Sequence, residues 1–150
     1  MTLQKRDILI YNGIEIPIWD DILYEYFKRY PERVTRTPFM ITSLWRGYFA
    51  EFEISEKNEL YIISLNRYIG INKKSSELYI PESVLDKAFP KTKKCDFFSG
   101  FIRIDNNYTD IENVEFKVLE FDNGNLIKEH ILTKPELEEL KNKKTVYNNV

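Results

Sequence analysis

Cysteine and histidine are almost absent from this chain of 150 residues, which contains Cys95 and His130 and no other residue of either type. A single cysteine cannot form an intrachain disulfide, and it rules out a cysteine-rich metal site. Nucleophilic triads, zinc sites and histidine-based acid–base catalysis all draw on these residue types. The sequence therefore favours a protein that is not an enzyme, indicates no catalytic residue, and predicts neither a metal nor a cofactor.

A structural role is the simpler interpretation of both His130 and Cys95. His130 lies in a predicted strand between Glu129 and Ile131, where most residues only pack or face solvent. Cys95 follows Lys93 and Lys94, whose charges would lower the pKa of a nearby thiol, but a lone thiol at the start of a strand usually packs.

Glycine-rich loops, an excess of basic charge and long apolar runs are also missing. The glycines are far apart, so no loop that cradles phosphate is present. The formal net charge of -2 gives no field that attracts nucleic acid or anionic lipid. The segment from Met1 to Asp7 is charged, and neither a signal peptide nor a membrane span follows it. We expect a cytoplasmic protein with no nucleic-acid or membrane partner.

Apolar and aromatic residues are plentiful, at 43% and 15% of the chain, and they are enough for a hydrophobic core. No repeat or linker divides residues 1–150, so we expect a single domain. The hydrophobic periodicity predicts an α+β fold that is predominantly antiparallel sheet, with about seven strands in hairpins and two or three short helices.

The N-terminal pattern predicts a hairpin and a helix. Residues 7–11 and 14–18 alternate on either side of Asn12-Gly13, the preferred pair for a type I′ turn. Pro17 donates no hydrogen bond, which indicates an edge strand. Helical spacing then predicts a helix over 20–30, with Asp20 as its N-cap and its end before Pro31.

The middle of the chain predicts a central hairpin of residues 48–54 and 60–65, preceded by a short strand over 39–44. Residues 66–77 show no clear period, and residues 81–89 are typical of a short helix.

Further strands are expected over 97–104, 114–121 and 125–132. Thr133 and Glu136 match a capping box for a final helix from Pro135 to about Lys143.

The most unusual local feature is the run Trp45-Arg46-Gly47-Tyr48 at the entrance of the central hairpin. Arg46 can present a planar fork to a carboxylate, while Trp45 and Tyr48 offer flat contact area. These three residues are the candidate ligand-binding residues. The alternative is that Gly47 permits a bulge, Arg46 pairs internally and the rings fill the core. A pair of strand carboxylates, Glu51 and Glu53, is a weaker candidate for acid catalysis.

Two blocks of sequence resemble an uncharacterised family of small bacterial proteins of unknown function. The first block is Trp45-Arg46-Gly47-Tyr48 followed by an alternating strand and Leu60-Tyr61, and the second is Phe98-Ser99-Gly100 followed by Phe101-Ile102-Arg103-Ile104. After Ile104 the chain departs from the family pattern, because residues 105–110 replace a stretch rich in histidine and glycine. The resemblance implies a bacterial protein with a β-rich fold, and it brings no activity, cofactor or catalytic residue.

These observations leave functions of different classes open. The leading hypothesis is a non-enzymatic binding or accessory protein with a protein partner, such as an immunity-like protein of bacterial competition, because aromatic residues often anchor interfaces. The alternative is a small-ligand-binding protein or enzyme with a pocket rimmed by Trp45, Arg46 and Tyr48. A third is a purely structural, oligomer-forming role, and the sequence does not specify the oligomeric state.

Overall fold

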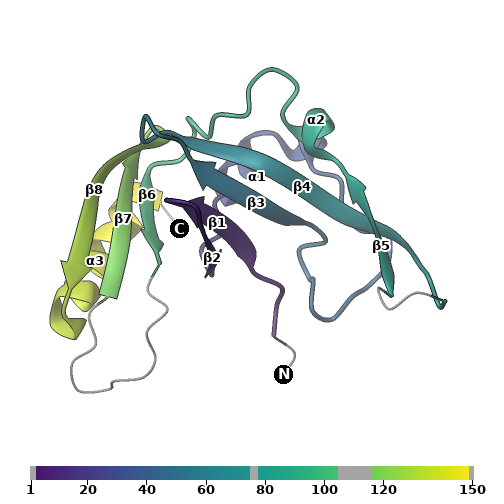
Figure 1. Cartoon of the computed structure of the whole chain (residues 1–150), viewed down its shortest axis with the longest axis horizontal. Coiled ribbons are helices and arrows are strands. Elements are labelled where there is room, and N and C mark those ends of the chain that lie inside the picture. Colours follow the sequence, from purple (N-terminus) through teal and green to yellow (C-terminus); the bar gives the residue numbers. More distant parts are fainter. Residues whose placement is uncertain (1–2, 75–77, 105–115, 149–150) are drawn as a thin grey trace.

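The computed structural model describes residues 3–74, 78–104 and 116–148, which form eight strands and three α-helices. The strands make two sheets, one with the order β2-β1-β3-β4-β5 and one with the order β6-β7-β8. Neighbouring strands are antiparallel except β1 and β3, which are parallel. The predicted α+β class, with mostly antiparallel sheet, is confirmed (Figure 1).

The elements have the following bounds. The five-stranded sheet contains β1 (Asp7–Tyr11), β2 (Ile14–Ile18), β3 (Phe49–Ile54), β4 (Leu60–Ile71) and β5 (Tyr79–Ser83). The three-stranded sheet contains β6 (Gly100–Arg103), β7 (Phe116–Asp122) and β8 (Asn125–Leu132). The helices are α1 (Tyr24–Arg29), α2 (Leu85–Ala88) and α3 (Lys134–Asn148), and a short 3-10 helix spans Pro31–Arg33.

The N-terminal hairpin forms as its turn chemistry predicts. Asn12 and Gly13 both have positive φ, at 53° and 76°, as a type I′ turn requires. Strand β2 pairs only with β1 and contains Pro17, so the predicted edge strand is confirmed. Ile16 and Ile18 are buried, while Ile14 beside the turn is exposed.

Strand β3 buries alternate residues, and its predicted hairpin with β4 is confirmed. Of the irregular segment predicted over 66–77, residues 75–77 lie outside the described residues and residues 72–74 form a turn, but the prediction is wrong for residues 66–71, because β4 continues to Ile71. Its second half pairs with β5, an edge strand that tolerates Pro81. The helix expected over 81–89 is therefore reduced to α2.

Two other local predictions are corrected by tertiary contacts. The first helix begins at Tyr24 and not near Asp20, whose Oδ2 instead accepts a hydrogen bond from the backbone N–H of Arg103 at 3.2 Å. Residues 39–44 are not a strand, because a turn buries Ile41 and Leu44 against the protein.

The C-terminal part follows the predicted order of three strands and a helix. Strand β6 is shorter than expected, and residue 114, where the second strand was expected to begin, lies outside the described residues. The backbone N–H of Thr133 donates to Glu136 Oε1 at 3.3 Å, which is a capping-box contact, and α3 continues beyond the predicted end at Lys143. In the described ranges, no helix has the length and apolar character needed to cross a membrane.

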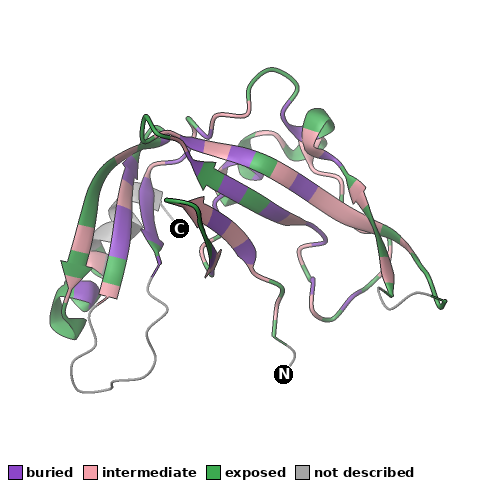
Figure 2. Cartoon of the chain, viewed as in Figure 1, coloured by how far each residue is buried: buried purple, intermediate pink, exposed green. Residues whose placement is uncertain are grey.

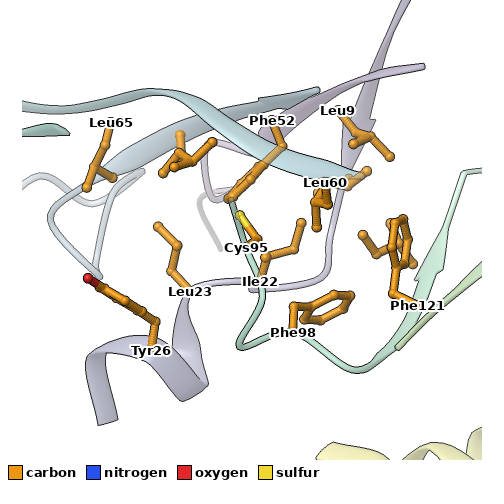
Figure 3. Packing of buried hydrophobic residues seen from close by; sticks show 14 of the residues in the cluster. Leu9, Ile22, Leu23, Tyr26, Phe52, Leu60, Leu65, Cys95, Phe98 and Phe121 are labelled. Carbon is orange, nitrogen blue, oxygen red and sulfur yellow. The ribbon is translucent and has the colours of Figure 1, made fainter. Parts of the chain in front are cut away.

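The main core lies between the five-stranded sheet and the segment that contains α1 (Figure 2). Ile22 and Leu23 point from this segment towards the sheet that carries Phe52 and Leu60, and Tyr26 points from α1 to the side on which Leu65 lies (Figure 3). Phe121 joins the same cluster from β7 of the three-stranded sheet, and Phe98 joins it from the loop before β6. A smaller cluster under α3 contains Phe101, Val118 and Leu137, so both sheets take part in hydrophobic packing.

The two sheets meet at the turn between β7 and β8. The carbonyl of Gly124 accepts a hydrogen bond from Leu60 at 2.8 Å, and its N–H donates to the carbonyl of Phe98 at 2.8 Å. Gly124 has a φ of +78°, and a Cβ built there would lie 2.5 Å from the carbonyl oxygen of Cys95. Both its conformation and its lack of a side chain are therefore needed for the contact.

Replacing Gly124 by alanine should destabilise the protein more than the same change at Gly13. Both glycines have positive φ, which costs alanine about 1–2 kcal/mol, but a Cβ at Gly13 meets no atom within 4 Å. The Gly124→Ala variant must also displace backbone, so we expect a total loss of about 3 kcal/mol or more in urea unfolding. Equal losses for the two variants would contradict the close contact at the sheet junction.

Candidate functional site

The run Trp45-Arg46-Gly47-Tyr48 leads into β3, and its position is determined by the parallel pairing of β1 with β3. Parallel pairing places the beginnings of both strands at the same end of the sheet. Asp7, the first residue of β1, is therefore next to the entrance of β3, where its Oδ1 accepts a hydrogen bond from the N–H of Ala50 at 2.8 Å. The site is thus built from two segments far apart in the sequence.

The residues before β1 fix the loop that contains Trp45. The backbone N–H of Lys5 donates to the carbonyl of Ser43 at 2.7 Å. The side chain of Gln4 accepts from the N–H of Trp45 at 2.8 Å and donates to the carbonyl of Thr42 at 2.7 Å. These bonds restrict the backbone on which the Trp45 ring is mounted.

Arg46 is the centre of an ionic cluster with Asp7 and Asp21. Its Nη2 forms an ion pair and hydrogen bond with Asp7 Oδ1, and its Nη1 lies 3.5 Å from Asp21 Oδ1. The guanidinium also lies over the ring of Tyr48, 4.8 Å from its centroid. Arg46 therefore links both carboxylates to the aromatic core.

This cluster, which we call the Asp7–Arg46–Asp21 cluster, has two carboxylates for one guanidinium. The side chain of Asp7 is 1% exposed, whereas those of Arg46 and Asp21 are 24% and 36% exposed. Burial raises the pKa of Asp7 above its ordinary value, although Arg46 and the N–H of Ala50 act in the opposite direction. Burial likewise raises the pKa of Asp21. For both carboxyls, burial disfavours the charged form more than Arg46 favours it.

One oxygen of the buried carboxylate has no partner. Asp7 Oδ2 is inaccessible to solvent, and no described residue forms a hydrogen bond with it. A buried acceptor without a donor costs about 1–3 kcal/mol.

The cluster lies at a hollow of about 240 Å³, which we call the tryptophan hollow. It is lined by Trp19, Trp45, residues 4–7, Asp20 and Asp21, together with Ile18 and Arg46. The rings of Trp19 and Trp45 are 60% and 68% exposed, although tryptophan is usually well buried. Arg6 stacks on Trp19, its guanidinium carbon 4.3 Å from the ring centroid.

A second hollow of about 190 Å³ adjoins the first and shares Trp19 and Asp20 with it. Its other lining residues come from the smaller core cluster and its surroundings: Phe101, Arg103, Val118, Leu137 and Leu140. Trp19 therefore lies between the ionic cluster and the three-stranded sheet.

The three residues singled out from the sequence have different environments. Trp45 and Arg46 line the tryptophan hollow. Tyr48 is 4% exposed and packs in the core, where its ring makes an edge contact with Phe27. Sequence reasoning missed Asp7, Trp19 and Asp21. The Trp19-Asp20-Asp21 run after β2 is unusual enough to be noticed, but only the tertiary structure brings it to Arg46.

The other residues that the sequence offers for chemistry lie outside the tryptophan hollow. His130 Nε2 lies 2.9 Å from Glu120 Oε1, and Cys95 is fully buried, which raises the pKa of its thiol. Glu51 and Glu53 are exposed on β3, away from the tryptophan hollow. Among the residues that the structure places, no group of three or more histidines, cysteines and acids is arranged to hold a metal ion.

Comparison with protein-family models, curated proteins and solved structures finds no significant match to this chain. The resemblance of the Trp45–Tyr48 and Phe98–Ile104 motifs to an uncharacterised bacterial family therefore stays a prediction.

Replacing Arg46 by alanine should be far more costly than replacing Arg67. Both arginine side chains are 24% exposed, but Arg46 pairs with a carboxylate that is 1% exposed and Arg67 with Glu82, which is 43% exposed. Removing one partner of a buried pair costs about 3–5 kcal/mol, whereas exposed pairs contribute about 0–1 kcal/mol. Urea unfolding should show this difference, and similar losses for the two variants would contradict a buried pair at Asp7.

The raised pKa of Asp7 predicts a specific pH dependence of stability. The folded protein binds the Asp7 proton at higher pH than the unfolded chain, whose ordinary value is 3.8. Stability therefore increases as the pH falls through the folded pKa, and Asp7→Asn has no such proton to bind. The unfolding free energy of the wild type minus that of the variant should increase from neutral pH towards 3.8 and level off below it. The opposite slope would show that Arg46 lowers the pKa of Asp7 more than burial raises it.

Proposed function

We propose that this chain is a non-enzymatic binding protein that recognises a protein partner through the surface around the tryptophan hollow. The observation that supports this most is that both tryptophans of the chain are exposed and line the same hollow. Tryptophan and arginine are enriched among the residues that contribute most to protein interfaces. An accessory role of the immunity type is consistent with such a surface.

The Trp19 ring and the Trp45 backbone are restrained before any partner binds. Trp19 stacks with Arg6, and the backbone of Trp45 is held by Gln4. Ordering a side chain on binding costs about 0.5–1.5 kcal/mol, so contact residues that are already restrained gain affinity. This restraint supports the proposal that a protein partner binds a surface that is already formed around the tryptophan hollow.

The size of the hollow favours a protein partner over a free metabolite. Small-molecule pockets usually have volumes of about 300–1,000 Å³. The tryptophan hollow, at about 240 Å³, is suited to a single inserted group with further contacts around the rim. A small ligand is the second candidate, and the charged residues Arg46 and Asp21 beside Trp45 are the observation in its favour.

A binding experiment with matched variants tests the proposal. The tagged full chain is used to capture partners from lysate at near-physiological salt, and any stoichiometric partner is purified and titrated against the variants. Trp45→Ala should weaken its binding by about tenfold or more, because truncated interface tryptophans often cost over 2 kcal/mol. Ile127→Ala removes a side chain that is 54% exposed on β8, away from the hollow, and should leave affinity unchanged.

Two results would contradict the proposed function. One is that no stoichiometric partner is captured by the wild-type chain. The other is that Trp45→Ala and Ile127→Ala bind a captured partner equally well, which would place the interface elsewhere.

A further inference from the structure

We propose that the tryptophan hollow receives a basic side chain, lysine or arginine, from the protein partner. This inference rests on the proposed function and adds the chemistry that the partner must present. It is based on the charge of the Asp7–Arg46–Asp21 cluster, on the unpartnered oxygen of Asp7 and on the two exposed rings.

The charge of the cluster favours a cation. Arg46 pairs with Asp7 through Nη2 and with Asp21 through Nη1, so one positive charge is shared between two carboxylates. Burial strengthens electrostatic interactions at Asp7 because water screens them less. An incoming ammonium or guanidinium group balances the second carboxylate, whereas an incoming anion adds to the excess of negative charge.

Hydrogen bonding at Asp7 points to the same kind of group. Asp7 lines the hollow, is 2% exposed, and its Oδ2 has no hydrogen-bond partner within the described part of the chain. Lysine and arginine side chains provide only donors, and such charge-assisted bonds to carboxylates are about twice as strong as neutral ones. A basic side chain therefore supplies the missing charge, and it supplies the missing donor when binding moves the Asp7 side chain enough to open Oδ2 to the hollow.

The two tryptophans complete a site for a basic side chain. Their rings can cover the aliphatic stem and contact the cation through their π faces. Arg6 already occupies this position over Trp19, where its guanidinium lies 4.3 Å from the ring centroid. Trp45 is 68% exposed and offers its ring to the partner.

Two cations at the rim do not reverse this preference. Lys5 is exposed, and its Nζ lies over the ring of Phe49, 4.9 Å from the centroid. Arg6 lies over Trp19. Salt and water screen the exposed charge of Lys5 far more than they screen the buried carboxylate of Asp7, and the guanidinium of Arg6 is engaged with the Trp19 ring.

Intrinsic tryptophan fluorescence tests the inference directly, because both tryptophans line the hollow. The full chain is titrated with short, capped glycine peptides that contain a single lysine, arginine, norleucine or glutamate, at constant ionic strength. The lysine or arginine peptide should cause a saturable change at concentrations about tenfold lower than norleucine, which has the same apolar stem without the charge. The glutamate peptide should cause none.

Variants of the cluster test where the cation binds. Asp7→Asn and Asp21→Asn should each weaken binding of the basic peptide by about threefold to tenfold. Asp21 is partly exposed, so its variant should retain the fold if the Asp7 variant does not, and circular dichroism checks both. Asp86→Asn is the matched control, because Asp86 is an exposed acid on α2 that pairs with Lys93, and it should leave binding unchanged.

The outcomes separate this inference from the proposed function. Three results would overturn the cation site: equal responses to the lysine, arginine and norleucine peptides, no response to any of them, or full binding of the basic peptide by Asp21→Asn. Each of these results is compatible with a protein partner whose capture requires Trp45. If the chain captures no partner but its fluorescence responds to free alkylamines as well as to basic peptides, the proposal of a protein partner would be overturned. The ligand would then be a small organic cation.

Discussion

The buried carboxylate of Asp7 is the interaction on which the candidate site depends. It accepts hydrogen bonds from the N–H of Ala50 and from Arg46, so it joins the start of β1 to the entrance of β3. The backbone bond from Lys5 to Ser43 continues the same junction towards the N-terminus. Without Asp7, Arg46 would have no buried ionic partner, and the loop that carries Trp45 would lose its ionic link to β1. The position of the tryptophan hollow follows from this one pairing.

The Asp7–Arg46–Asp21 cluster has more negative than positive charge, and it lies beside an exposed aromatic surface. Asp7 and Asp21 share Arg46, and burial raises the pKa of both carboxylates. Proteins usually pair buried charges fully, and perturbed carboxylates are enriched at functional sites. Here the imbalance lies next to Trp19 and Trp45, both of which remain exposed. A partner that carries a basic group fits both features, whereas neither feature improves the stability of the isolated protein.

Local patterns predicted the elements whose signals are short-range. The Asn12-Gly13 turn, the alternation in β3 and the Thr133–Glu136 capping contact all appear where the sequence indicated them. The failures have tertiary causes. Asp20 does not cap α1 because it bonds to β6, and the second half of β4 is ordered by pairing with β5, which no local period reveals. The unusual run of residues 45–48 points to Trp45 and Arg46, but Asp7 is found only from the parallel β1–β3 pair, a contact between distant segments.

A double-mutant cycle between Asp7 and Arg46 is the most direct test of this account. Asp7→Asn, Arg46→Met and the combined variant are compared with the wild type in urea unfolding. A coupling free energy of about 2 kcal/mol or more is predicted, because each single change leaves a buried group without its partner and the double change removes both. Additivity within about 0.5 kcal/mol would contradict the central claim that this buried pair connects β1 to the entrance of β3.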